Sequence, residues 1–113
     1  YSYMEVLAEL GVLLGIIYIF GFIIGIYTGT KTRQVAKIVP EPKNFSFIHL
    51  SLFFIYLGIS CFVLLLSLLS LALLEDAGTP ITFFGWDFYA YFVFLGYSHY
   101  YGILCANHLI MFS

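Results

Sequence analysis

Three long apolar runs dominate this sequence of 113 residues, at about 6–27, 45–74 and 88–112. A helix needs about 20 apolar residues to cross the hydrocarbon core of a bilayer, and each run is long enough. Backbone N–H and C=O groups inside lipid must be paired within their own segment, so each run is predicted to be helical. The sequence therefore predicts an all-α integral membrane protein, with one domain over 1–113 and three transmembrane helices in a small bundle.

The composition favours the same fold class and argues against an enzyme. Hydrophobic residues make up 63% of the chain and charged residues 9%, whereas soluble domains carry about 25% charged residues. A soluble domain of this length has too little interior to hide so much apolar surface. The sequence has no nucleotide-binding glycine loop, no Ser/His/Asp set and no metal-ligand spacing. We therefore predict no catalytic residues, no metal site and no binding of nucleic acid.

All four basic residues lie in the stretch 28–44, which the sequence predicts to be a loop. They are Lys31, Arg33, Lys37 and Lys43. Lys and Arg in short loops remain on the cytoplasmic or matrix side of the membrane. We therefore expect this loop and the C-terminus inside, and the N-terminus and the acidic, aromatic loop 75–87 outside. The same basic side chains are predicted to bind the headgroup of a cardiolipin-like phospholipid.

Small residues recur at four-residue spacing along the predicted helices, and this spacing lets a second helix approach closely. They are Gly11, Gly15, Gly21, Gly25 and Gly29 in the first helix, Gly58 in the second, and Ser98, Gly102 and Ala106 in the third. The pattern leaves open whether the glycine face of the first helix packs within the chain or against another subunit. The second helix has small residues on two opposite sides, which indicates that it has a neighbouring helix on each side. A bundle of three helices is not expected to place neighbours on both sides of one helix.

Three histidines, His49, His99 and His108, are ionisable residues within the apolar runs, and such residues are functional candidates. His99 and His108 point about 180° apart on one helix, so they cannot ligate the same cofactor. His49 begins the second run and His108 ends the third on the same side of the membrane, so these two are expected to meet. Haem b or a quinone is possible there, but structural hydrogen bonding is the simpler interpretation and no cofactor is predicted.

Residues 97–103 (YSHYYGI) resemble the helix with His and Gly found in succinate dehydrogenase membrane anchors. The spacing from His to Gly differs by one residue, and the arginine expected after the Gly-Ile pair is absent. The resemblance implies three spans and contact with haem b and a quinone. It covers about ten residues and gives an alternative function, a haem- or quinone-contacting membrane anchor.

The main hypothesis is a non-catalytic accessory subunit of a large energy-transducing membrane complex, of the respiratory chain or an ATP synthase. The polar parts are short, the helices carry small residues on several sides, and no self-contained active site is present. Such a subunit would pack between larger subunits and lipid. The mitochondrial inner membrane is the expected location, and a bacterial inner membrane is the alternative. A small homo-oligomeric channel or transporter is the third possibility, with serines of the second run as the candidate pore lining.

Overall fold

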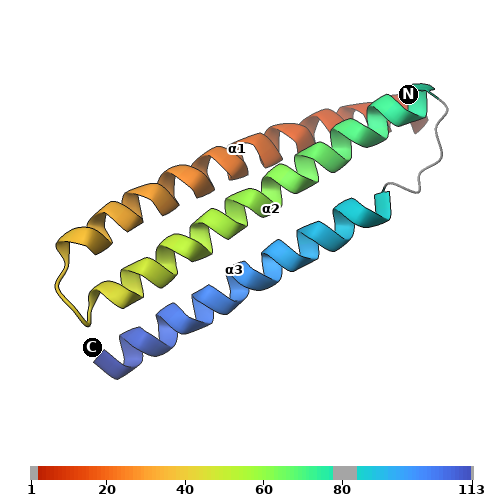
Figure 1. The fold of residues 1–113 in the computed structure, drawn as a ribbon. Coiled ribbons are helices and arrows are strands. Elements are labelled where there is room, and N and C mark those ends of the chain that lie inside the picture. The colour runs from red at the N-terminus through yellow and green to blue at the C-terminus, as the bar shows by residue number, and fades with distance from the viewer. Residues whose placement is uncertain (1–2, 78–83, 113) are drawn as a thin grey trace.

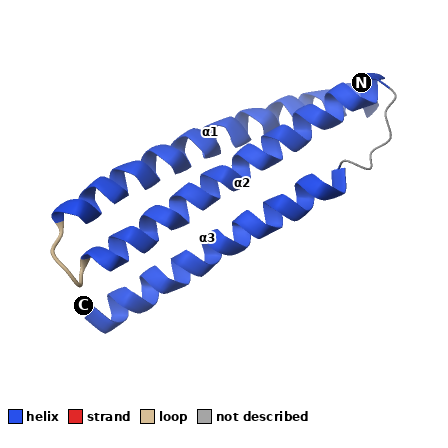
Figure 2. Ribbon diagram, in the orientation of Figure 1, coloured by secondary structure: helices blue, strands red, loops and turns tan. Residues whose placement is uncertain are grey.

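The computed structural model describes residues 3–77 and 84–112, and it folds into three antiparallel helices (Figure 1). Helix α1 spans Tyr3–Ile38, α2 spans Asn44–Ala77 and α3 spans Phe84–Phe112. Outside the turn at 39–43, every described residue is helical (Figure 2). The prediction of an all-helical chain with three helices is confirmed. The molecule is elongated, with a longest dimension of 56 Å, because the helices lie nearly side by side.

The three helices form one layer with α2 in the middle (Figure 1). Helix α2 contacts α1 on one side and α3 on the other, and within the described residues α1 and α3 do not touch. The sequence predicted a small helical bundle, and the described helices form an open layer in which α1 and α3 are not in contact. This layer also corrects the expectation that three helices cannot place neighbours on both sides of α2. Two opposite faces of small residues on one helix favour a layer, because each face packs against a different helix.

The first polar stretch is mostly helical, although the sequence analysis placed a loop over 28–44. Helix α1 continues to Ile38 and leaves a turn of only five residues, 39–43, which contains Pro40 and Pro42. Polar residues end a membrane span but do not end a helix, and no proline interrupts the chain before Pro40. Lys37 lies in the last turn, where a positive charge stabilises the helix dipole. Most of the second predicted loop, 78–83, lies outside the described residues.

Two of the helices have the length and composition of membrane spans. Within the described residues these segments are Glu9–Ile38 of α1 and Asn44–Leu69 of α2. Helix α3 has 29 residues and the necessary length, but its tyrosines, its two histidines and Asn107 make it more polar. The third transmembrane helix therefore stays a prediction.

Glycines bring the backbones of α1 and α2 together near the middle of the layer. A Cβ atom added to Gly25 would lie 2.7 Å from the Cα of Gly58 and 2.9 Å from the carbonyl oxygen of Phe54. One turn further along α1, the hydroxyl of Ser51 donates a 2.6 Å hydrogen bond to the carbonyl oxygen of Gly29. Ser51 is 1% exposed, so this bond lies inside the contact. The predicted glycine face is therefore used within the chain at these positions.

The other glycines of α1 lie in looser surroundings. A Cβ on Gly21 would meet the Sγ of Cys61 at 2.6 Å, which is a side-chain contact and not a backbone contact. A Cβ on Gly15 would make an ordinary contact of 3.5 Å with Leu68. Nothing described lies within 4 Å of the corresponding position on Gly11. The close approach of the two helices thus weakens toward the N-terminus of α1.

The contact between α2 and α3 depends on Ser98, which is also 1% exposed. Its hydroxyl donates a 2.9 Å hydrogen bond to the carbonyl oxygen of Phe53. A Cβ on Gly102 would lie 3.0 Å from the Phe53 ring, so this glycine faces a movable side chain. Ala106, the third small residue of the predicted face, is exposed. The face therefore packs against α2 over its first two members.

Replacing Ser98 by alanine is expected to destabilise the chain by about 1 kcal/mol, the net value of one buried hydrogen bond between helices. The measurement is the free energy of unfolding in mixed micelles containing sodium dodecyl sulfate. Ser67→Ala is the matched control, because the Ser67 hydroxyl donates to Val63 of its own helix and joins no two helices. Equal losses in the two variants would show that the Ser98 bond contributes nothing specific to the α2–α3 contact.

Candidate functional site

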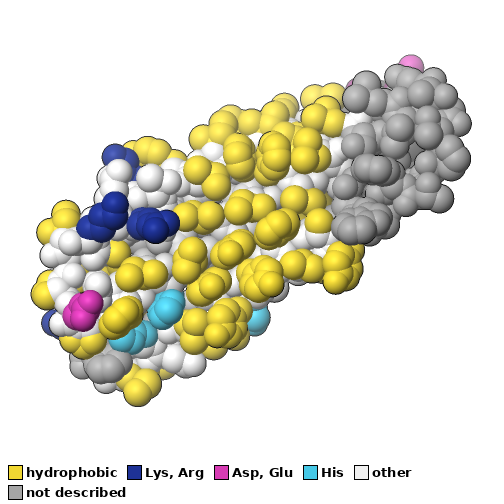
Figure 3. Space-filling model, viewed as in Figure 1, with side chains coloured by type: hydrophobic (Ala, Val, Ile, Leu, Met, Phe, Trp, Pro, Cys, Tyr) yellow, Lys and Arg dark blue, Asp and Glu magenta, His cyan; other side chains and the backbone are white. Residues whose placement is uncertain are grey.

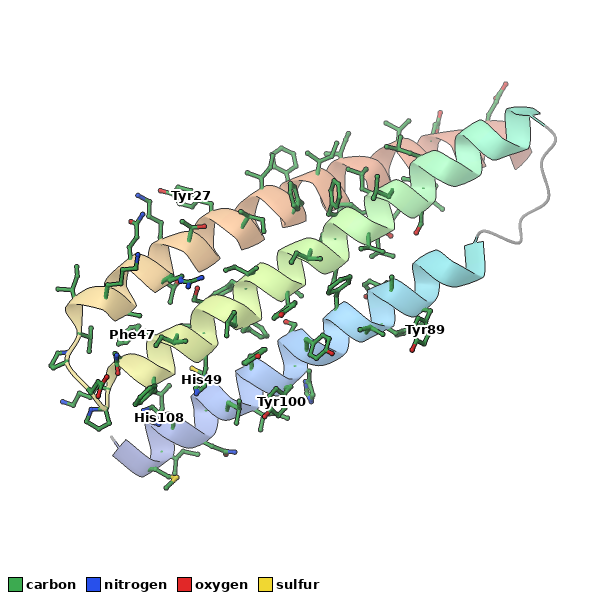
Figure 4. All side chains as sticks on the ribbon, in the orientation of Figure 1. Tyr27, Phe47, His49, Tyr89, Tyr100 and His108 are labelled. Carbon is green, nitrogen blue, oxygen red and sulfur yellow. The ribbon has the colours of Figure 1, made fainter. Side chains whose placement is uncertain are left out.

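His49 of α2 and His108 of α3 lie together at the turn end of the molecule, the end that holds residues 39–43 (Figure 4). Their ring centroids are 6.3 Å apart and the rings are nearly perpendicular. Phe45 presents an edge contact to His108 at 5.8 Å, and Tyr101 stacks on His49 at 6.2 Å. The antiparallel course of α2 and α3 brings the start of one beside the end of the other. The two histidines therefore meet as the sequence predicted.

His108 ties the end of α3 to the turn between α1 and α2. Its Nε2 atom lies 2.6 Å from the carbonyl oxygen of Pro42. A carbonyl oxygen can only accept, so Nε2 carries the proton and donates it. The backbone N–H of Phe45 donates to the same oxygen at 3.2 Å. One carbonyl of the turn thus binds both α2 and α3 at this end.

The histidine pair does not have the arrangement of two axial haem ligands. Such a pair directs one nitrogen of each ring at the same iron, whereas Nε2 of His108 is directed at Pro42. The Nδ1 atom of His49 is buried and has no hydrogen-bond partner in the described part of the chain. The geometry therefore gives the haem alternative no support.

The third predicted histidine, His99, lies apart from this pair and is exposed. It lines an open groove of about 480 Å³ between α2 and α3. The other lining residues are Phe53, Leu57, Phe92, Leu95, Gly96 and Ser98. The groove is thus apolar apart from the imidazole of His99 and the hydroxyl of Ser98, and that hydroxyl already bonds to Phe53.

His99 belongs to a stripe of exposed residues along α3, which we name the α3 outer face. Its members are exposed and recur at helical spacing; they are Tyr89, Phe92, Gly96, His99, Tyr100, Ile103, Asn107 and Ile110. Tyr89 and Tyr100 are labelled along α3 in Figure 4. The small residues and the histidines, each taken alone, do not reveal this face in the sequence. A helical projection of the polar residues at 99, 100 and 107 would have found it.

Lys and Arg side chains gather at the turn end, and hydrophobic side chains cover most of the remaining described surface in this view (Figure 3). Lys31 lies over the ring of Tyr27, with its Nζ atom 5.6 Å from the ring centroid. Arg33 and Lys37 line a pocket of about 310 Å³ between α1 and α2. Lys43 lies in the turn and is exposed. Of the four residues predicted to bind a lipid headgroup, Arg33 and Lys37 therefore line a pocket, whereas Lys31 and Lys43 do not.

Comparisons with known proteins give no relative from which a function can be transferred. No family model matches the chain, and no similar protein was found among curated proteins or solved structures. Within the described residues, no three His, Cys, Asp or Glu side chains are placed to hold a metal ion. The function must therefore be argued from the exposed surfaces of the three helices.

Proposed function

We propose that this chain is a non-catalytic membrane subunit and that the α3 outer face packs against a transmembrane helix of another subunit. In this proposal all three helices cross the membrane. The partner helix presents hydrogen-bonding side chains to His99, Tyr100 and Asn107. The chain thereby fills the space between larger subunits on one side and lipid on the other.

The observation that carries this proposal is the polarity of the middle of this face, where the described residues leave His99, Tyr100 and Asn107 exposed. His99 and Asn107 are exposed and form no hydrogen bond with the described residues. Tyr100, 55% exposed, has a ring contact with Tyr101 but no described partner for its hydroxyl. In lipid the side chains of His99 and Tyr100 have no water to bind, and each unpaired polar group costs about 1–3 kcal/mol. A protein neighbour removes that cost, whereas lipid chains do not.

The shape of the face fits a helix as the neighbour. Nothing described lies within 4 Å of a Cβ position on Gly96, so the backbone of α3 is open there. Gly96 also lines the groove of about 480 Å³ that contains His99. A small residue beside an open groove lets a second helix come close and insert a side chain. Polar side chains then act as the hydrogen-bonding contacts between helices.

The setting we propose is a large energy-transducing complex, of the respiratory chain or an ATP synthase, in the mitochondrial or bacterial inner membrane. Support comes from the short polar segments and from helices with several faces suited to packing. The basic turn end lies on the matrix or cytoplasmic side in this proposal, because all four Lys and Arg residues are there. The acidic residues of the 75–87 segment then lie on the opposite side.

The test is mild detergent extraction from the native membrane, separation on a native gel and mass spectrometry of the band that contains the chain. We expect a band of high molecular mass with many other proteins. Gly96→Trp should lower the amount of chain in that band about fivefold or more, because overpacking a close contact costs about 1–3 kcal/mol. Ile24→Trp is the control, since Ile24 is 59% exposed on α1 and lies on another helix.

Two results would contradict the proposal. A small band that contains this chain alone, in one or several copies, would favour the homo-oligomeric channel or transporter. Equal retention of Gly96→Trp and Ile24→Trp in the large band would show that the α3 outer face is not the contact. Alkaline carbonate extraction of the same membranes checks the membrane integration of both variants.

A further inference from the structure

We propose that the pocket between the turn ends of α1 and α2 binds the headgroup of one anionic phospholipid, with Arg33 and Lys37 on its phosphate. The inference rests on the membrane placement proposed above but not on the contact made by the α3 outer face. It assigns one site and one ligand class to residues that the sequence analysis treated as a general basic surface. We name this site the lipid pocket.

The lipid pocket holds two positive charges and no negative charge. Its volume is about 310 Å³, and its lining residues are Arg33, Ala36, Lys37, Asn44, Ile48, Ser51 and Leu52. Arg33 and Lys37 are four residues apart on α1, so both project from one face of the helix. Neither has an ion-pair partner among the side chains that the structure describes. A phosphate supplies the counter-charge, and the guanidinium can bind two of its oxygens.

The start of α2 adds to the attraction for an anion. Asn44 is the first residue of α2 and lines the pocket, so the positive end of that helix dipole lies beside the two cations. The Oδ1 atom of Asn44 is buried and accepts no hydrogen bond from described groups. Its amide can therefore turn and direct N–H groups at a phosphate without losing an existing bond. The Ser51 hydroxyl is not available, because it bonds to Gly29.

The lining changes from charged to apolar along the helices, which selects a lipid over a soluble anion. Lys37 and Asn44 lie nearest the turn, Arg33 lies about level with Ile48 because Gly29 pairs with Ser51, and Leu52 lies further along α2. Asn44 and Leu52 are separated by about 12 Å of helix rise. A phospholipid has the same order, with a phosphate at the membrane surface and acyl chains below it. A free phosphate would contact only the charged part.

The other two basic residues provide a matched control. Lys31 and Lys43 are near the same membrane surface but do not line the pocket. The variants R33Q/K37Q and K31Q/K43Q each remove two positive charges, so both lose a similar long-range attraction to anionic lipid. Any additional loss in R33Q/K37Q measures the pocket itself.

The experiment is native mass spectrometry of the purified full chain, extracted in mild detergent and mixed with phosphatidylglycerol or phosphatidylcholine. We expect one phosphatidylglycerol to stay bound to the unaltered chain. R33Q/K37Q should bind it about tenfold more weakly, and K31Q/K43Q about twofold more weakly. Equal weakening in the two variants, or equal retention of the two lipids, would overturn the proposal.

Two further measurements test whether the apolar part of the pocket binds the lipid and whether the ligand is a soluble anion. Ile48→Trp keeps every charge but fills the apolar part of the pocket, so it should also release phosphatidylglycerol; undiminished binding would contradict the site. Soluble glycerophosphate should not displace the lipid, and displacement at equal concentration would identify a soluble-anion site instead. Carbonate extraction of the variants reports membrane integration separately, and the native gel of Gly96→Trp reports the subunit contact. Failure of the lipid site is thereby distinguished from failure of the proposed function.

Discussion

Replacing Gly25 by alanine is expected to separate α1 from α2 and to destabilise the chain by about 2–3 kcal/mol. The new Cβ would lie 2.7 Å from the Cα and 2.8 Å from the N of Gly58, and 2.9 Å from the carbonyl oxygen of Phe54. These are backbone atoms, so no side chain can turn aside and the helices themselves must shift. Overpacking costs about 1–3 kcal/mol, and we place Gly25→Ala at the upper end of that range, net of the gain in helix propensity.

The measurement is unfolding in mixed micelles containing sodium dodecyl sulfate, followed by energy transfer between fluorophores on α1 and α2. Gly102→Ala is the matched control, since it makes the same change on α3. There the nearest atoms belong to the Phe53 ring, at 3.0 Å and 3.3 Å, and a ring can rotate by the small amount required. We expect Gly102→Ala to change stability by less than about 1 kcal/mol. Equal losses at both glycines would contradict the backbone contact between Gly25 and Gly58.

The sequence predicts the number and order of the helices because the three apolar runs are long and clearly separated. It also predicts that His49 and His108 meet, since antiparallel neighbours place the start of α2 beside the end of α3. The end of α1 was not predictable from hydrophobicity alone. Polar residues after 27 end the apolar run but stay helical as far as Ile38.

The arrangement of the helices was harder to predict than their existence. Small residues on α2 indicate two close neighbours, but the pattern does not say whether α1 and α3 also touch. In the structure, α1 and α3 do not touch within the described residues. The Ser51 hydroxyl bonds α2 to α1, and the Ser98 hydroxyl bonds α3 to α2. The lipid pocket depends on the same arrangement, because it forms where the extended end of α1 passes the start of α2. Sequence analysis assigned 28–44 to a loop and so could not place Arg33 and Lys37 on one helical face.

Replacing all four basic residues by glutamine is expected to give the chain a mixed orientation in the membrane. Lys31, Arg33, Lys37 and Lys43 are the whole Lys and Arg content of this sequence. The orientation of a helical membrane protein follows the bias of Lys and Arg between its two sides, and this variant has no bias left. Adding two lysines at the N-terminal end, by Ser2→Lys and Tyr3→Lys, should then invert the chain.

The measurement is labelling of Glu41→Cys with a membrane-impermeant thiol reagent, applied to sealed vesicles of known sidedness. Glu41 is exposed in the turn, so its accessibility reports the side on which the turn end lies. The unaltered chain should be labelled from the matrix or cytoplasmic side alone, the glutamine variant from both sides and the inverted variant from the opposite side. Glu5→Gln with Glu9→Gln is the control, because acidic residues contribute little to orientation. If the glutamine variant kept one orientation, the partner subunits or the helices themselves would have to fix the topology, and the positive charges would not determine the orientation.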